Sequence, residues 1–346
     1  MHESNKHLNR RNVLKGTLAV AAAPALITSA RAQPKIQWKL QSHWPKGVES
    51  FRGSLGVLGR ELEARTDGRF EIEFLGAGEI AKGPEIFNVV RRGVVQMGTT
   101  SSAYNLGESE LQGMYYGVPG SLRDPWEMMH LTKNLGLEAA INKLLEPRGV
   151  FYLADKAYPT ELVLKDGIEP GTDLSGIKVR STGTMLEFLA AAGFAPQFID
   201  GAELYQAIAT GIVDGAHWGG AAGALGMKLW EVAKVHMQPA LMIANDVYII
   251  NTEAYEKLPE DLRVIFRSLV EERYFARSVD YKYQEAIALN TGLSKMGVRV
   301  EQFPADVLAR FAEASQAALA KEVAKGPAAK EYGEKLSGLM KELGYL

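Results

Sequence analysis

The alternation of two hydrophobic periods along the chain constrains its fold more than any other feature. Apolar residues stand at every second position at 36–40, 70–75 and 95–100, as in strands, and at helical spacing at 49–65 and 87–94. Strands that alternate with helices are typical of βαβ units and mainly parallel sheets. The sequence therefore predicts an α/β fold.

The same alternation returns after residue 130, so we expect two similar α/β halves. The second set comprises helices at 130–145, 184–192 and 202–210, and strands at 149–154, 162–165, 176–180 and 212–218. A chain of this length is also longer than one hydrophobic core usually serves, which favours two domains.

A long helix is predicted between Pro259 and Gly292, where the chain has no proline or glycine and apolar residues recur at helical spacing. A helix of roughly 30 residues would be about 45 Å long and would outspan one small domain. We expect it to brace both halves. The alternative is two helices separated by an unmarked kink.

The N-terminus contains the parts of an export signal in the required order. Residues 9–15 read Asn-Arg-Arg-Asn-Val-Leu-Lys, an uncharged run follows at 16–30, and Ala-Arg-Ala stands at 30–32. The run is too short to cross a hydrocarbon core of roughly 30 Å as a permanent helix. We predict a twin-arginine signal peptide at 1–32, folding before export, and a periplasmic mature chain from Gln33; a frayed amphipathic terminus is the alternative.

Charge and cysteine content exclude several classes of function. Without residues 1–32 the chain loses five of its 39 basic residues and one of its 41 acidic residues, which leaves a formal net charge of −6. This balance suggests no basic face and no nucleic-acid partner. The chain has no cysteine, so disulfides, thiolate nucleophiles and cysteine-ligated metals are excluded.

Polar and aromatic residues follow several of the predicted strands. In open α/β sheets, ligands bind beyond the carboxyl ends of the strands. Arginine offers a planar fork for a carboxylate and tryptophan an apolar wall, so these residues would suit a small anion with an apolar portion. The candidate ligand-binding residues are His43, Trp44, Tyr104, Asn105, Tyr158, Arg180, His217 and Trp218.

Each main candidate also has a purely structural interpretation. Arg180 could be a surface strand residue paired with an acid, and His217 could be a buried histidine with satisfied hydrogen bonds. Trp218 could be part of the core. Residues 44–47, Trp-Pro-Lys-Gly, could simply turn the chain.

Catalytic patterns are scarce. The serines of residues 99–102 lie in no nucleophile elbow, and no paired histidines or carboxylates have the spacing of a metal hydrolase. The glycine-rich stretches at 76–78 and 219–226 match no phosphate-binding loop. An enzyme is therefore the weaker hypothesis.

Several segments, in their order and spacing, resemble a known family. The chain is similar over nearly all of its mature length to the solute-binding subunits of tripartite ATP-independent periplasmic (TRAP) transporters, of the DctP type. The segments that carry the resemblance are 76–80, 83–87, 90–98, 174–180, 203–208, 211–218 and 251–259.

The resemblance implies a two-lobed periplasmic-binding-protein fold that closes over an organic acid, whose carboxylate pairs with Arg180. Hinge strands and a long helix would join the lobes. It places lobe I at 33–155, lobe II at 156–250, and a hinge return with C-terminal helices at 251–346. The acid would be handed to a membrane permease of two subunits driven by an ion gradient.

The pattern is most similar to the α-keto-acid-binding branch, with one departure. Trp218 matches the branch, but His217 stands where the branch has a glutamate that helps to hold a cation beside the ligand. This replacement argues against a copied sodium or calcium site. A neutral histidine could donate a hydrogen bond to the ligand, and a protonated one could add a second positive charge.

Assembly and role have their own expectations. The chain ends at Leu346 without the additional helix that some branch members exchange, so we expect a monomer. Two other roles stay open: a periplasmic enzyme that acts on an organic acid, and a protein that presents its ligand to a membrane sensor.

Overall fold

A computed structural model describes residues 35–346, and the predicted signal peptide lies outside the described residues. One mixed sheet of nine strands organises this part of the chain, in the order β2-β1-β3-β8-β4-β7-β5-β6, with β9 paired to β8. The strands are β1 Ile36–Gln41, β2 Phe70–Leu75, β3 Met97–Ser101, β4 Val150–Leu164, β5 Lys178–Ser181, β6 Ala195–Phe198, β7 Gly215–His217, β8 Val235–Asn251 and β9 Arg299–Gln302.

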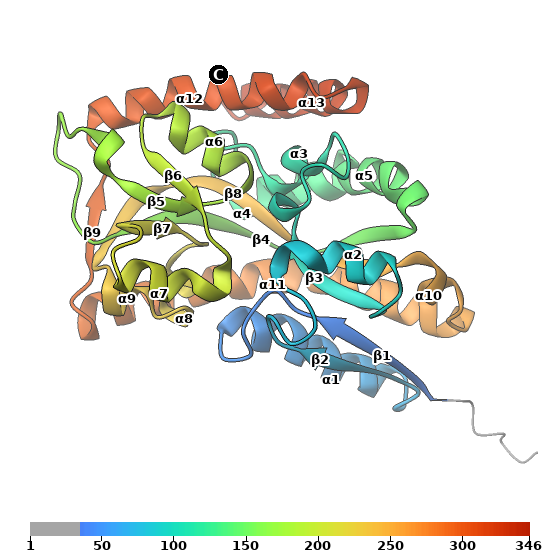
Figure 1. The fold of residues 1–346 in the computed structure, drawn as a ribbon. Helices are drawn as coiled ribbons and strands as arrows, with labels where there is room; N and C mark the ends of the chain where they lie inside the picture. The colour runs from blue at the N-terminus through green and yellow to red at the C-terminus, as the bar shows by residue number, and fades with distance from the viewer. Residues whose placement is uncertain (1–34) are drawn as a thin grey trace, which may run out of the picture. The chain divides into compact units, whose positions relative to one another are not determined.

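Two long antiparallel strands, β4 and β8, connect the two ends of the sheet (Figure 1). Strands β2, β1 and β3 lie on one side of this pair, with β1 parallel to both neighbours. Strands β7, β5 and β6 lie on the other side, with β5 parallel to both neighbours. The mainly parallel α/β fold is confirmed, with short strands grouped on each side of the shared pair.

Strand β4 differs from its prediction, because the two strands expected at 149–154 and 162–165 are one strand of 15 residues. Asp155, Lys156 and Glu161 interrupt the apolar pattern of the sequence, yet all three are buried. The register against β8 shifts between Ala154 and Lys156, and again between Thr160 and Leu162. The polar side chains lie at these register shifts, where they have buried partners. A prediction based on the apolar pattern alone therefore divides this strand in two.

The helices cover the sheet and connect its strands (Figure 1). They are α1 Val57–Arg65, α2 Ile86–Arg91, α3 Gln112–Tyr116, α4 Pro125–Met129, α5 Leu137–Leu145, α6 Gly183–Ala191, α7 Leu204–Ala209, α8 Ala221–Gly226, α9 Leu229–Val232, α10 Thr252–Glu256, α11 Glu260–Lys295, α12 Ala305–Val323 and α13 Pro327–Glu342.

The predicted long helix is one continuous element, α11, of 36 residues. It begins after Pro259 and ends before Gly297, whose φ of 66° is the left-handed conformation that commonly terminates helices. At 1.5 Å per residue the helix is about 54 Å long. Arg277 on α11 pairs with Glu49 near the first strand, and Glu285 accepts a hydrogen bond from the backbone of Ala222 in α8. The helix therefore contacts elements on both sides of the long strand pair.

Other predicted helices are shorter or interrupted. Residues 51–56 form a turn of π-helix that leads into α1. The helix expected at 130–145 is broken at Gly136, where φ is 81°, and α5 begins after it. Helix α2 ends at Arg91, so Val94 lies outside it and is exposed. Among residues 35–346, no helix combines the length and the apolar character that crossing a membrane requires.

Candidate functional site

A cavity of about 50 Å³ lies where the strand ends of both sides of the sheet meet the long strand pair. Its walls come from the loop after β1, the end of β3, helix α3, the centres of β4 and β8, the ends of β5 and β7, and helices α8 and α11. The lining residues are His43, Trp44, Val48, Glu49, Ser50, Ser101, Tyr104, Tyr116, Tyr158, Arg180, Thr182, His217, Trp218, Gly219, Ala222, Gly223, Met227, Asp246 and Tyr281.

Arg180 lies near the end of β5 and is 1% exposed, so it is no surface residue. Its Nε donates to the carbonyl of Ile199 and its Nη1 to the carbonyl of His217, both at 2.9 Å. Its Nη2 lies 3.4 Å from the hydroxyl of Tyr104. A guanidinium has five N–H groups, so two of them have no protein acceptor among the described residues. These two groups are free to bind an anion in the cavity.

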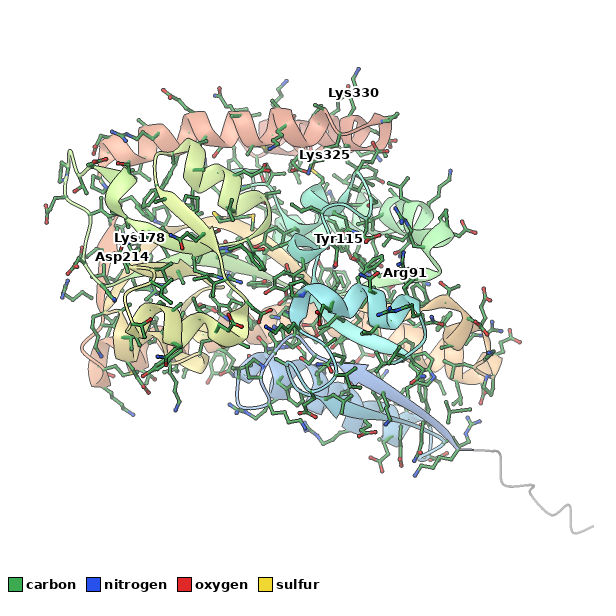
Figure 2. The ribbon with its side chains drawn as sticks, viewed as in Figure 1. Arg91, Tyr115, Lys178, Asp214, Lys325 and Lys330 are labelled. Carbon is green, nitrogen blue, oxygen red and sulfur yellow. The ribbon has the colours of Figure 1, made fainter. Side chains whose placement is uncertain are left out.

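The indole of Trp218 forms a wall beside this guanidinium. Arg180 Cζ lies 4.8 Å from the centroid of the Trp218 ring, a cation–π contact. The orientation of the guanidinium is therefore determined on one face by the indole and along its edges by two carbonyl groups. By contrast, Lys178 on the same strand is exposed and lies beside Asp214 (Figure 2).

His217 ends β7 and is buried, with both ring nitrogens engaged. Nδ1 lies 3.0 Å from Ser181 Oγ, and Nε2 lies 3.0 Å from the hydroxyl of Tyr116. Burial and the neighbouring Arg180 lower the pKa of His217 to about 3, so the ring is neutral near pH 7. The hydroxyl of Tyr116 remains protonated there, because burial raises its pKa.

A second group of polar side chains lies on the long strand pair. Lys156 Nζ is 2.6 Å from Asp246 Oδ2, and the hydroxyl of Tyr158 donates to Asp246 Oδ1 at 3.0 Å. His43 Nε2 is 3.9 Å from the same Oδ1, and its Nδ1 is 2.9 Å from Thr99 Oγ1. Burial lowers the pKa of His43 to about 4 despite the nearby carboxylate of Asp246. Lys156 Nζ also lies 3.4 Å from Asp155 Oδ2, so this side of the cavity contains a buried lysine shared by two carboxylates and a neutral imidazole.

The cavity brings together seven of the eight residues expected from the sequence. Asn105 is the exception, because its amide donates to Thr100 Oγ1 at 3.2 Å and to the hydroxyl of Tyr152 at 3.2 Å. It is buried, and its hydrogen bonds hold the turn after β3 rather than a cavity wall. Tyr158 lines the cavity, but from within β4 instead of from a strand end.

The sequence-based prediction did not include Tyr116, Asp246 and Tyr281 among the lining residues. Asp246 could have been found from the sequence, because Asn245 and Asp246 interrupt the apolar run that forms β8. Buried polar residues in such a run need hydrogen-bond partners. Tyr116 and Tyr281 had no comparable signal. Their proximity to the cavity depends on how α3 and α11 pack against the sheet.

The fold and cavity define the class: a mainly parallel α/β protein with long shared strands and a secluded cavity that presents a guanidinium. A family model for bacterial extracellular solute-binding proteins of family 7, DctP, matches residues 49–325. The chain belongs to this family. A model of the twin-arginine translocation signal matches residues 7–26, which with the family confirms export to the periplasm.

Named relatives extend this result. The monocarboxylate 2-oxoacid-binding periplasmic protein of Nostoc sp. is 25% identical, over 97% of this chain and 95% of that protein. The C4-dicarboxylate-binding periplasmic protein DctP of Rhodobacter capsulatus is 26% identical, over 76% of this chain and 77% of its own length.

A solved structure shares the fold. The TRAP periplasmic solute-binding protein of Pseudoalteromonas atlantica, with bound sodium and pyruvate, has a TM-score of 0.82 and 21% identity, covering 89% of this chain and 95% of the other. The periplasmic-binding-protein fold that the sequence resemblance implied is thus confirmed.

Proposed function

We propose that this protein captures a small organic acid in the cavity and delivers it to the membrane permease of a TRAP transporter. The observation that carries the proposal is the guanidinium of Arg180, which is buried at the cavity with two N–H groups that have no acceptor within residues 35–346. A carboxylate supplies two acceptor oxygens in the geometry that this fork requires. Bound organic acids in the names of the relatives support the same ligand class.

The remaining site residues receive roles from their positions. Trp218 provides the apolar wall, and Tyr104 orients the guanidinium from the other side of the sheet. His217 and Tyr116 form a neutral hydrogen-bonding edge. Tyr158 and His43 face the ligand from the long strand pair and the loop after β1.

Capture proceeds by closure of two lobes, 33–155 and 156–250, about the long strands. Contacts between the two segments run through the site itself: Arg180 with Tyr104, and His217 with Tyr116. A ligand stabilises the closed form only by as much as it binds that form more tightly. Because both segments contribute groups to one cavity, the ligand contacts more of these groups in the closed form and binds that form more tightly.

Screening of ligand-free protein tests this function. Mature protein, unfolded and refolded to remove co-purified ligand, is screened by thermal shift against keto, hydroxy, aromatic and dicarboxylic acids. Hits are followed by calorimetry. At one hundred times its dissociation constant a ligand stabilises by about 2.7 kcal/mol, which is an easily measured shift. If no organic acid shifts the melting temperature, the proposal is wrong.

The receptor role excludes turnover and requires a permease. Mass spectrometry of the acid after prolonged incubation should recover it unchanged; conversion would identify an enzyme instead. Reconstituted permease should take up the acid only with this protein present, and failure there with intact binding would favour presentation to a sensor. Light scattering should give the mass of a monomer, and small-angle scattering should show compaction when ligand is added.

A further inference from the structure

Two acids, Glu161 in β4 and Glu285 in α11, lie behind the loop at 218–223, which forms one wall of the cavity. A Cβ at Gly220 would lie 2.4 Å from Glu285 Oε2 and 3.1 Å from Glu161 Oε2, so both carboxylates pack against this one glycine. Neither acid is among the residues that line the cavity. We call them the acid pair, and they contact the loop from outside the cavity.

Backbone hydrogen bonds join the acid pair to residues that do line the cavity. Glu285 Oε1 accepts from the N–H of Ala222 at 3.1 Å, and the N–H of Glu161 donates to the carbonyl of Gly219 at 2.8 Å. These two loop residues line the cavity, as does Tyr281, one turn before Glu285 in α11. Helix α11 runs beside α8 here (Figure 1). A displacement of Glu285 relative to Glu161 therefore displaces the cavity wall.

The acid pair has no lysine or arginine partner within residues 35–346. Lys282 and Arg123 line the same hollow of about 230 Å³ as the acid pair. Lys282, however, is paired with Asp124. The guanidinium of Arg123 lies over the Tyr345 ring, 3.8 Å from its centroid. Two carboxylates thus face one glycine without a cationic side chain to compensate them, an arrangement that favours uptake of a proton.

Strand β8 supplies the groups that face Glu161. His236 Nε2 lies 2.5 Å from Glu161 Oε2, and the amide of Gln238 donates to Glu161 Oε1 at 3.4 Å. His236 is fully buried, and Glu161 is 8% exposed. Partners on β8 therefore determine the position of Glu161, whereas Glu285 approaches it from a different element.

Glu285 is the member of the acid pair whose charge is disfavoured. Burial, and after it the negative charge of Glu161, raise the pKa of Glu285 to about 8, against hydrogen bonds from the backbone of Ala222 and Ala221 and from Tyr281. Near pH 7 the carboxyl of Glu285 is therefore mostly protonated and neutral.

We infer that Glu161 and Glu285 position the ligand-binding loop by sharing one proton, so that the affinity for the organic acid depends on whether this proton is present. The inference rests on the proposed function, since it assigns two positioning residues to the same site. With the proton in place, a neutral carboxyl and a carboxylate can both stay against Gly220. Without it, two negative charges repel each other across Gly220, and the loop must move to relieve the repulsion.

The direction of the pH dependence follows from this arrangement. The loop position that binds the ligand is the one that brings the two carboxylates together, so it holds the proton more tightly than a displaced loop does. Affinity is therefore greatest on the acid side and is lost as the pH rises through about 8. The histidines and tyrosines of the cavity wall titrate outside the range from about pH 6 to 9, because burial lowers the pKa of the former and raises that of the latter.

Calorimetry on the full mature protein between pH 6 and 9 tests the inference, with pyruvate, pyroglutamate and succinate as probes. A group that titrates near pH 8 is about nine-tenths protonated at pH 7 and about one-tenth protonated at pH 9. The dissociation constant of a bound probe should therefore rise about tenfold between these two values. At pH 8, titrations in phosphate and Tris, which differ in ionisation enthalpy, should show that protons are taken up with the ligand.

Glu285→Gln replaces the protonated carboxyl with a neutral amide that can still accept from Ala222. In this variant the dissociation constant should change less than about twofold from pH 7 to 9, with no proton uptake at pH 8. Glu272→Gln is the matched control, because Glu272 lies on the same helix in an exposed ion pair with Arg65. It should retain the pH profile of the wild type.

Nuclear magnetic resonance of the empty protein gives a readout that needs no ligand. The side-chain carboxyl carbon of Glu285 should titrate well above the range of an ordinary glutamate, and the amides of Gly219, Gly220 and Ala222 should shift with the same midpoint. In Glu285→Gln these amides should not shift between pH 6 and 9.

The outcomes separate this inference from the function on which it rests. If a probe binds with the same affinity at pH 7 and 9, or if the ring of His236 titrates in this range in place of Glu285, the inference is overturned while the receptor function stands. If no organic acid binds at any pH, the proposed function is overturned, and the resonance titration still decides whether the acid pair shares a proton. The wild-type measurements suffice even if Glu285→Gln fails to fold.

Discussion

Lys156 Nζ lies 2.6 Å from Asp246 Oδ2, and the same two residues are register partners in the pairing of β4 with β8. Both side chains are buried, and the ammonium also lies 4.2 Å from the centroid of the Trp44 ring. This ion pair joins the two long strands at a register shift, directly beside the cavity. It holds the wall of the site and the centre of the sheet together.

Removal of one partner of this ion pair should lower the stability of the folded protein. Lys156→Met leaves Asp246 buried without its cation, and we expect the free energy of unfolding to fall by about 3–5 kcal/mol. Lys156→Met combined with Asp246→Leu should be more stable than the single variant, since only Asp155, which keeps its hydrogen bonds from Ser54 and Tyr248, then lacks the lysine. Urea unfolding at pH 7 measures the stability of both variants.

Lys257→Met, which breaks an exposed pair with Glu253, is the control and should change stability by less than about 1 kcal/mol. Equal losses at the two positions would contradict the role of burial.

Arg180→Lys keeps the charge of the anchor but removes its planar fork. We expect the dissociation constant for the carboxylate to rise at least about tenfold, which corresponds to about 1.4 kcal/mol. The melting temperature of the empty protein should fall as well, because the carbonyls of Ile199 and His217 lose their donors. Lys178→Gln, on the exposed face of the same strand, should leave both quantities unchanged. Titration calorimetry and thermal unfolding provide the two measurements, and unaltered affinity in Arg180→Lys would exclude a bidentate anchor.

The position of Trp218 can be tested through a glycine that touches it. A Cβ at Gly201 would lie 2.2 Å from the Trp218 ring, so Gly201→Ala must displace the indole from Arg180. We expect roughly tenfold weaker binding and a shift of the tryptophan emission. Gly176 is also in a 3-10 turn, and a Cβ there meets nothing within 4 Å, so Gly176→Ala is the matched control. Unchanged affinity and emission in Gly201→Ala would show that the indole wall is dispensable.

Two buried histidines predict a loss of stability in acid. The pKa of His217 is lowered to about 3 by burial and Arg180, and that of His43 to about 4 by burial and Lys156, against the opposing effect of Asp246 and Asp155. In the unfolded chain these histidines bind protons near pH 6.5, whereas in the folded protein they stay neutral at that pH. The contribution of the two neutral histidines to the free energy of unfolding is therefore complete above pH 6.5 and declines as the pH falls toward 3–4. Each histidine adds a slope of at most about 1.4 kcal/mol per pH unit in this range.

Urea unfolding at a series of pH values, on wild type and His217→Gln, isolates this contribution. The difference in unfolding free energy between the two proteins should shrink as the pH is lowered from 7 to 4. A difference that is constant across this range would mean that His217 has the same pKa in the folded and the unfolded protein.

Much of the architecture follows from local pattern. Strands at 70–75 and the helix after Pro259 were predicted nearly at their observed bounds, because period-2 alternation and an uninterrupted helical period are set by neighbouring residues. The position of Arg180 at a strand end could also be predicted from the sequence. The continuity of strand β4 could not, because a lysine such as Lys156 is normally exposed, and its buried partner, Asp246, lies 90 residues away in the sequence.

The sequence by itself determined the export signal, the α/β class, the long helix and seven of the residues that line the cavity, since periodicity and strand ends are local properties. Tertiary structure alone decided that Asn105 turns away, that Tyr116, Asp246 and Tyr281 join the cavity, and that His217 is held neutral between Ser181 and Tyr116. The physical reason is that burial and charge compensation depend on contacts between segments far apart in the chain, which no local pattern encodes.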